Sequence, residues 1–113
     1  MNNVQDLPVY KKASTLSKEI CSMCEKWLGG DVLSLAAHIR ESSIRICTNL
    51  DQAWDRRCSE EEFVEKLSNA AAVCIETKTW LDLAFTGDYI TVEQHTRLTR
   101  ECRRIDTMLY DMI

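Results

Sequence analysis

Residues 40–57 read RESSIRICTNLDQAWDRR, and this segment decides the fold of the chain. Its apolar residues Ile46, Leu50 and Trp54 return at every fourth position, a spacing that predicts an amphipathic helix. Small and polar residues occupy positions at which an ordinary bundle helix would carry larger apolar side chains. We therefore expect a helix with an unusual face, and we expect any function of the chain to reside on it.

The length and composition of the chain favour a single all-α domain. A chain of 113 residues forms one domain, which at this size buries roughly two-thirds of the surface exposed in the unfolded state. Only three glycines and one proline occur, and they lie near the expected ends of helices. Such a composition favours long helices over a sheet with many turns.

Hydrophobic periodicity extends the helical prediction to four segments. The first apolar stripe recurs at steps of three and four residues and consists of Ala13, Leu16, Ile20, Met23 and Trp27. The second stripe consists of Leu35, Ile39, Ile46, Leu50 and Trp54, the third of Phe63, Leu67, Ala70, Cys74, Thr77, Leu81 and Ala84, and the fourth of His95, Leu98, Cys102, Ile105 and Leu109. Within one domain of residues 1–113, the predicted helices span residues 7–28, 32–57, 60–86 and 92–112. Gly29 and Gly30 are expected to end the first helix, and Asp31 is expected to cap the second.

Two capping signals and a glycine define the remaining helix boundaries. Ser59 with Glu62, and Thr91 with Gln94, have the spacing of a capping box, in which two side chains satisfy free backbone amides at a helix start. Gly87 suits the left-handed conformation that commonly follows a helix end. These signals place the third and fourth helices.

Short connections between the four segments predict antiparallel neighbours, and therefore an up-down-up-down four-helix bundle. A three-helix bundle with a swapped fourth helix and a dimer of extended helical hairpins are alternatives that remain open. Ile44, Val64, Ile75 and Trp80 lie off the main stripes, so the apolar surface is wider than one helix partner could cover. We therefore expect the chain to associate with itself.

The N-terminal sequence and the cysteines favour a reducing compartment. No apolar run approaches the ~18–20 residues that span a bilayer, and the first residues lack the basic and apolar regions of a signal peptide. We expect a cytoplasmic protein without a membrane partner, whose six cysteines are reduced thiols. Cys21 and Cys24 have Cys-x-x-Cys spacing, but the absence of a second pair disfavours a zinc site or a redox motif.

Metal-binding and catalytic motifs are absent from the sequence. Two-metal sites of four-helix bundles need a Glu-x-x-His motif on two helices, and neither His38 nor His95 stands in one. We expect both histidines to serve in packing or capping. No Gly-x-Ser-x-Gly turn, Gly-rich phosphate loop or cysteine-histidine pairing occurs, so we expect no enzyme activity, catalytic residue, metal or cofactor.

The charge balance argues against nucleic-acid binding, whereas the positions of the arginines leave it open. The net charge is −4 and the isoelectric point is about 5.2, while proteins bind nucleic acids mainly through lysine and arginine. Arginines nevertheless gather on the second and fourth helices. The candidate nucleic-acid contacts are Arg45, Arg56, Arg57, Arg97, Arg100, Arg103 and Arg104. The alternative interpretation is a solvated surface with ion pairs inside each helix.

Five residues are candidates for structural or interface roles. Glu76 lies among apolar residues and needs a partner if it is buried, for which Arg40 is the candidate. Asn49 lies in mid-helix despite its poor helix propensity, so we expect it to hydrogen-bond across an interface. Trp54 and Trp80 are expected to anchor the core or an interface, and Trp54 also lies beside arginines that would suit stacking on a base.

Short motifs along most of the chain match the pattern of a known family. In the first two helices they are Leu7–Ala13, Ile39-Arg40, Ile46, Asn49 and Arg56. In and after the third helix they are Glu62-Phe63, Leu67, Ala70, Glu76, Thr79-Trp80-Leu81, Leu83-Ala84 and Tyr89-Ile90-Thr91. On these residues the chain resembles the S23-type four-helix-bundle proteins encoded within intervening sequences of bacterial 23S ribosomal RNA genes. That family is distantly related to the accessory variability determinant of diversity-generating retroelements.

The resemblance implies a left-handed four-helix bundle that assembles as a ring, a homopentamer, with no assigned enzyme activity. The retroelement branch binds nucleic acid and a reverse transcriptase through a strongly basic surface, which this chain would need to match. The chain departs from the family pattern at Cys47, Ala53, Asp55 and Ala72, where the family has proline or glycine. The first three changes favour a straighter second helix.

We therefore predict a non-enzymatic, oligomeric four-helix-bundle protein that acts as an assembly or interaction scaffold. The alternative function is that of an accessory protein that binds RNA or DNA, with a reverse transcriptase as a further partner. Salt-sensitive binding to nucleic acid would distinguish the second function from the first.

Overall fold

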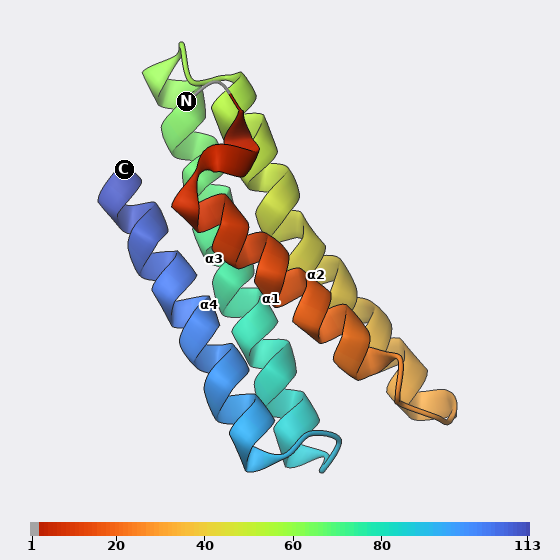
Figure 1. Cartoon of the computed structure of the whole chain (residues 1–113). Helices are drawn as coiled ribbons and strands as arrows, with labels where there is room; N and C mark the ends of the chain where they lie inside the picture. The colour runs from red at the N-terminus through yellow and green to blue at the C-terminus, as the bar shows by residue number, and fades with distance from the viewer. Residues whose placement is uncertain (1–2) are drawn as a thin grey trace.

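The computed structural model describes residues 3–113, apart from the side chain of Asp31, and contains four long α-helices. The elements are the 3-10 helix η1 (Val4–Asp6) and the α-helices α1 (Pro8–Cys24), α2 (Gly30–Asp55), α3 (Glu60–Thr86) and α4 (Val92–Met112). Successive helices run antiparallel, and each helix packs against two neighbours, with α4 returning to α1 (Figure 1). The bundle measures 46 × 22 × 21 Å. The predicted up-down-up-down four-helix bundle is confirmed.

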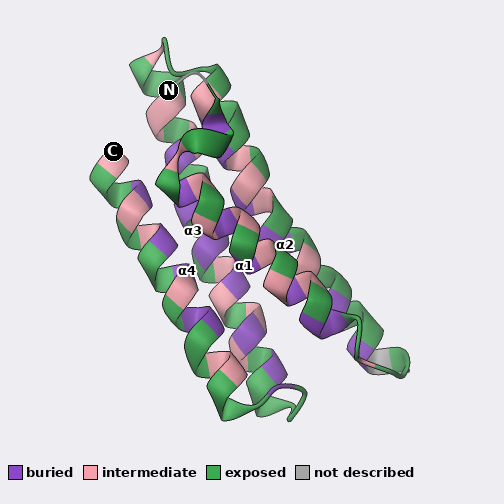
Figure 2. Ribbon diagram, in the orientation of Figure 1, coloured by how far each residue is buried: buried purple, intermediate pink, exposed green. Residues whose placement is uncertain are grey.

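One apolar core runs along the inward faces of all four helices (Figure 2). Its largest fully buried apolar side chains include Leu16, Ile20, Ile39, Ile46, Leu50, Leu67, Leu81, Leu98, Ile105 and Leu109. All of them belong to the apolar stripes found in the sequence. Leu35, Trp54 and Phe63, which the same stripes placed inside, are only half-buried. The helical periodicity thus identifies the centre of the core better than its edges.

Buried hydroxyls account for small and polar residues in the segment 40–57. Ser42 on α2 and Thr77 on α3 are fully buried, and their hydroxyl oxygens lie 3.0 Å apart. Each hydroxyl also lies within hydrogen-bonding distance of a carbonyl of its own helix. On another side of α2, the Ser43 hydroxyl lies 3.4 Å from that of Ser17 on α1. Small side chains therefore let α2 approach both neighbours closely while these hydroxyls keep partners.

The first helix ends earlier than the sequence predicts. α1 stops at Cys24, whereas the apolar stripe suggested an end at Leu28. Beyond Cys24 the chain turns, and the ring of Trp27 packs against Tyr89 in the α3–α4 turn, with ring centroids 5.9 Å apart. Trp27 therefore continues the apolar spacing without continuing the helix, because its partner lies in a distant turn.

The second helix begins two residues earlier than the predicted start at residue 32. Gly29 has a φ of 113°, which favours glycine, and it directly precedes the first helical residue, Gly30. The predictions that the two glycines end α1 and that Asp31 caps α2 are therefore wrong. Asp31 lies inside the first turn, and its side chain is outside the described part of the structure. α2 then continues without interruption to Asp55, short of the predicted end at residue 57.

The predicted starts of α3 and α4 are confirmed. Thr91 and Gln94 form a complete capping box, with bonds of 2.8 and 3.1 Å. Ser59 accepts a hydrogen bond from the Glu62 amide at 3.3 Å, but α3 has no complete capping box. Gly87 follows α3 with a φ of −81°, so the predicted left-handed glycine is wrong. Asp88, the next residue, has the positive φ instead, at 63°.

Candidate interaction surfaces

One ion pair joins α2 to α3 on the outside of the bundle. The Arg45 guanidinium donates to the Glu76 carboxylate at 2.5 Å, and it also lies 3.9 Å from Glu41. The side chains of Arg45 and Glu76 are 40% and 42% exposed, so this is a surface pair. The predicted pairing of Arg40 with Glu76 is wrong, because Arg40 points about 140° away from Arg45 on the same helix. Its charge instead acts on Cys24 of α1.

We expect the Arg45–Glu76 pair to contribute about 0.2–1 kcal/mol to the free energy of unfolding, as other exposed ion pairs do. A double-mutant cycle with Arg45→Gln and Glu76→Gln, followed by urea denaturation at low salt, measures this coupling. The same cycle with Arg40→Gln in place of Arg45→Gln is the control and should give no coupling. Equal coupling in both cycles would contradict the assignment.

Two of the predicted interface residues make contacts within the chain. Asn49 donates its side-chain amide to the Arg45 carbonyl at 2.8 Å, within its own helix. The expected Asn49 bond to another helix of the bundle is therefore wrong. Trp80 is half-buried, and the exposed ring of His38 stacks on it with centroids 4.5 Å apart. Trp80 thus covers part of the outer contact between α2 and α3. The stacking of His38 on Trp80 agrees with the packing role predicted for His38.

The outer face of α3 carries no charge over most of its length. Its exposed residues between positions 68 and 83 are Ser68, Asn69, Ala72, Ile75, Thr79 and Leu83. Ile75 and Leu83 are 56% and 51% exposed, and Ile44 on α2 is 46% exposed. A helix face turned to water ordinarily carries charged and polar residues. We call these six residues the uncharged face of α3; from the sequence, only Ile75 in this set was recognised as lying off the core stripe.

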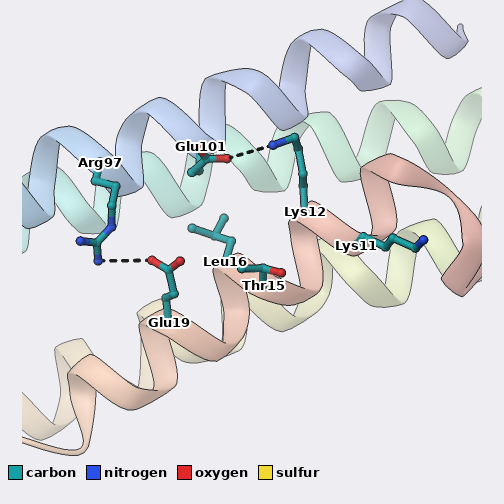
Figure 3. Close-up of a pocket in the computed structure, with 7 residues that line it drawn as sticks. All are labelled: Lys11, Lys12, Thr15, Leu16, Glu19, Arg97 and Glu101. Carbon is teal, nitrogen blue, oxygen red and sulfur yellow. Dashed lines mark ion pairs between the residues drawn. The ribbon is translucent and has the colours of Figure 1, made fainter.

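α1 and α4 contact each other less than any other neighbouring helices, and an open groove of about 320 Å³ lies between them. Leu16 lies in this groove, and Figure 3 shows the two ion pairs that bridge it. Arg97 lies 3.3 Å from Glu19, and Lys12 lies 3.7 Å from Glu101. All four charged side chains are at least 26% exposed. Exposed ion pairs therefore supplement a limited apolar contact between α1 and α4.

A second hollow, of about 370 Å³, runs along α4 and is lined mainly by cations. We call it the basic groove, and its cations are Lys12, Arg100, Arg103 and Arg104. Arg104 lies 2.9 Å from Glu101, whereas Arg100 and Arg103 form no ion pair with any residue that the structure describes. Lys12 was not a predicted contact, because the sequence does not show which lysines of the first helix lie beside the fourth.

The arginines predicted on the second helix do not reach the basic groove. Arg56 and Arg57 follow the end of α2, in the turn to α3. Arg57 donates to the Trp54 carbonyl at 2.7 Å, and its guanidinium lies 4.5 Å from the centroid of the Trp54 ring. Arg45 is held on the α2–α3 side by Glu76. Among the predicted arginines, Arg100, Arg103 and Arg104 of α4 therefore gather in the basic groove, whereas Arg97 of the same helix lies in the groove between α1 and α4.

A polar cluster ties α3 to the first turn of α4. Nε2 of His95 lies 2.7 Å from one carboxylate oxygen of Asp82, and Lys78 donates to the other at 3.0 Å. Burial alone would raise the pKa of the Asp82 carboxyl, but these hydrogen bonds outweigh burial and hold the pKa below its ordinary value. The ring of Phe85 stacks on that of His95, with centroids 4.6 Å apart. This geometry agrees with the packing role expected for His95.

All six cysteines are free thiols, and burial makes several of them poor nucleophiles. Burial raises the pKa of Cys24 to about 11 and that of Cys102 to about 12, and it also raises the pKa of Cys74. Among the described residues, no three histidine, cysteine or acidic side chains are grouped so that they could hold a metal ion. None of the described helices combines the length and apolarity of a membrane-spanning segment.

Comparison with known proteins finds similarity in sequence and in fold. The family model described as 23S rRNA-intervening sequence protein matches residues 5–111. The fold is similar to the crystal structure of a protein of unknown function from the S23 ribosomal protein family of Bacteroides thetaiotaomicron. The TM-score is 0.80, and the alignment covers 92% of this chain and 93% of the other at 24% sequence identity. No curated protein matches the chain.

Proposed function

Because the chain belongs to the family of 23S rRNA-intervening sequence proteins, we propose that it is a homo-oligomeric assembly protein without enzyme activity. Its role is to present several copies of one surface from a symmetric scaffold in the cytoplasm. The resemblance of its sequence motifs to those of ring-forming S23-type proteins favours five subunits. The partner of the chain is, in the first place, another copy of itself.

The observation that carries this proposal is the uncharged face of α3. Ile75 and Leu83 are more than half exposed on it, and the partly exposed charged residues that flank them, Glu76, Lys78 and Asp82, are engaged in ion pairs. Contiguous exposed apolar side chains mark surfaces that interact with other molecules. A second chain could cover this face without removing a charge from water, which would otherwise oppose association.

Lysine substitutions on the uncharged face test the proposal. We expect the double variant Ala72→Lys/Thr79→Lys to lower the mass measured by light scattering toward the 13.0 kDa of one chain, because both ammonium groups would be buried in the interface. Thr15→Lys is the matched control, since Thr15 is exposed on α1, which does not contact α3 within the described part of the chain. A folded double variant with unchanged mass would exclude this face as an assembly surface.

A second function, nucleic-acid binding, is favoured by the basic groove. Arg100 and Arg103 lack ion-pair partners among the described residues, so their charges are available to phosphate groups. The net charge of −4 opposes such binding by one chain. Assembly would repeat the groove in every subunit, and the resulting avidity would offset a weak individual contact.

Gel-shift titrations with structured RNA and with duplex DNA, at low and at moderate salt, test the second function. For duplex DNA, we expect Arg100→Glu to weaken binding and to lower the slope of log K against log salt by about 0.9 for each phosphate that the variant no longer neutralises. Arg56→Glu changes a charge outside the basic groove and serves as the control. If the wild-type chain shows no salt-sensitive binding to either nucleic acid, this function is rejected and the assembly proposal is unaffected.

A further inference from the structure

We infer that the open side of α1 and α4 binds a short amphipathic helix of a partner protein. The acidic half of that helix would meet the basic groove, and its apolar half would enter a neighbouring apolar hollow. The site goes beyond the proposed assembly function, because it lies on α1 and α4, away from the uncharged face of α3, and takes a different partner. It also differs from a nucleic-acid site, because half of it is apolar.

A hollow of about 300 Å³ lies beside the first turn of α1 and the last turns of α4. It is lined by Leu7, Pro8, Val9, Met108, Asp111 and Met112, and we call it the apolar hollow. Leu7, Met108 and Met112 pack at the edge of the core and are only half-buried. Methionine side chains are flexible and polarisable, so they adapt to apolar ligands of different shapes. The apolar hollow can therefore receive aliphatic side chains of another molecule.

The apolar hollow continues directly into the basic groove. Met108 lines both, and on α1 the lining passes from Pro8 in the hollow to Lys12, one turn later, in the groove. On α4 a row of lining residues with a spacing of four comprises Arg100, Arg104, Met108 and Met112. Residues at this spacing lie on one face of a helix, so the row is about 18 Å long. One half of this surface is thus cationic and the other half is apolar.

The cationic half retains charge that the chain itself does not neutralise. Lys12 and Arg104 share one acid, Glu101, at 3.7 and 2.9 Å. Arg100 and Arg103 are exposed, and neither forms an ion pair with a residue that the structure describes. Carboxylates of a ligand can therefore pair with these two arginines without displacing an existing partner.

Asp111 gives the surface a direction. Among the described residues, it is the only acidic one that lines either the apolar hollow or the basic groove. A carboxylate of the ligand would be repelled near Asp111 and attracted at Arg100, about three turns away along α4. The ligand that fits therefore carries its acidic residues at one end and its apolar residues at the other.

The arrangement of α1 and α4 favours a helix as the ligand. These two helices share the least extensive contact of any neighbouring pair, so hollows follow each other along the line between them. An amphipathic helix that lies in such a groove is a recurrent mode of recognition, in which side chains three and four residues apart serve as anchors. A helix of about 12–14 residues would cover the row of α4 from Arg100 to Met112.

A nucleic acid would use only the cationic half of the surface. Its phosphates pair with arginines and its bases stack on aromatic rings, but no aromatic residue is among the described residues that line the apolar hollow. The hollow would stay exposed in such a complex, whereas an amphipathic helix would cover it. The apolar hollow therefore favours a protein partner.

Fluorescence anisotropy with a designed peptide tests the site on the full chain. The probe is a labelled helical peptide of about 14 residues, with glutamates in one half and leucines at helical spacing in the other. We expect saturable binding in the micromolar range. The control peptide has the same composition with glutamates and leucines interleaved, and it should bind about tenfold more weakly or worse, because it cannot match both halves. Equal binding of the two peptides, or no binding of the probe up to about 1 mM, would contradict the inference.

Substitutions in each half of the surface give a second readout. We expect Arg100→Glu, and separately the double variant Met108→Gln/Met112→Gln, to weaken binding of the probe about tenfold or more. Arg56→Glu makes the same change of charge outside the surface and should leave binding unchanged. Circular dichroism checks folding, and Met112→Gln alone replaces the double variant if that variant is unfolded. Binding that depends on Arg100 but not on the methionines would reduce the site to a charged patch and overturn the inference.

Duplex DNA, titrated in the same assay, distinguishes the two kinds of partner. The methionine substitutions change no charge, so we expect them to weaken binding of the peptide and to leave any binding of DNA unchanged. Binding of DNA without binding of the peptide would assign the basic groove to nucleic acid and overturn the inference. None of these readouts depends on the mass of the assembly. A wild-type chain that sediments at 13.0 kDa would therefore reject the assembly function, while binding of the peptide would still support this site.

Discussion

Leu81→Ala is expected to lower the free energy of unfolding by about 2–5 kcal/mol. Leu81 lies in the C-terminal third of α3 and is completely buried in the core. Its truncation removes apolar contacts and leaves a cavity that rigid neighbouring helices can fill only in part. Urea denaturation at one fixed protein concentration measures the loss, because assembly would make the apparent stability depend on concentration.

Leu83→Ala is the matched control for this substitution. Leu83 lies two residues further along the same helix, and its side chain is 51% exposed. In the dissociated chain, we expect its truncation to change the free energy of unfolding by no more than about 0.5 kcal/mol. Equal losses for Leu81→Ala and Leu83→Ala would contradict the orientation of α3.

Thr77→Val is expected to lower the free energy of unfolding by about 1–3 kcal/mol. The substitution keeps the shape of the side chain but removes the hydroxyl that lies 3.0 Å from Ser42 and 2.8 Å from a backbone carbonyl of α3. Both residues are completely buried, so water cannot replace the missing partner. Thermal or urea unfolding under the conditions used for Leu81→Ala measures the effect.

Thr79→Val controls for the change from threonine to valine itself. The Thr79 hydroxyl donates to the carbonyl of Ile75 at 3.1 Å, the same bond to the residue four positions earlier that Thr77 makes, but Thr79 is exposed. We expect a change of no more than about 0.5 kcal/mol, since water can hydrate the carbonyl. A neutral Thr77→Val would show that the buried hydroxyls do not stabilise the α2–α3 contact.

The fold could be predicted from the sequence because most of its determinants are local. Apolar spacing predicted the four helices, and the Thr91 capping signal predicted the start of α4. The end of α1 could not be found in this way. Trp27 continues the apolar spacing of α1, but its contact with Tyr89 in a distant turn shows that it belongs to a loop. A pattern along one segment does not distinguish these two situations.

The interaction surfaces were predictable only in part, for a related reason. Ile44 and Ile75 were recognised as lying off the core stripes, and both are exposed. The partner of Glu76 was not predicted correctly, because the choice between Arg40 and Arg45 depends on the register of α2 against α3. That register follows from buried contacts between helices, which leave no periodic signal in either sequence. Lys12 could not be predicted as part of the basic groove for the same reason, because its position depends on the register of α1 against α4.

The segment 40–57 acquires a specific role in this account. α2 is a single helix from Gly30 to Asp55, as expected from the absence of proline and glycine at positions 47 and 53. Its inner side carries the hydroxyl that meets α3, and its outer side carries Ile44 followed by the hollow lined by Asp51 and Asp55. An uninterrupted helix keeps these outer residues in one row along α2.

Native mass spectrometry of the wild-type chain tests the assembly proposal most directly, because it counts subunits without any substitution. The account predicts one dominant species of five chains, each of 13.0 kDa, that dissociates in the double variant Ala72→Lys/Thr79→Lys. A wild-type spectrum containing only the 13.0 kDa chain, at concentrations up to the highest that can be sprayed, would contradict it.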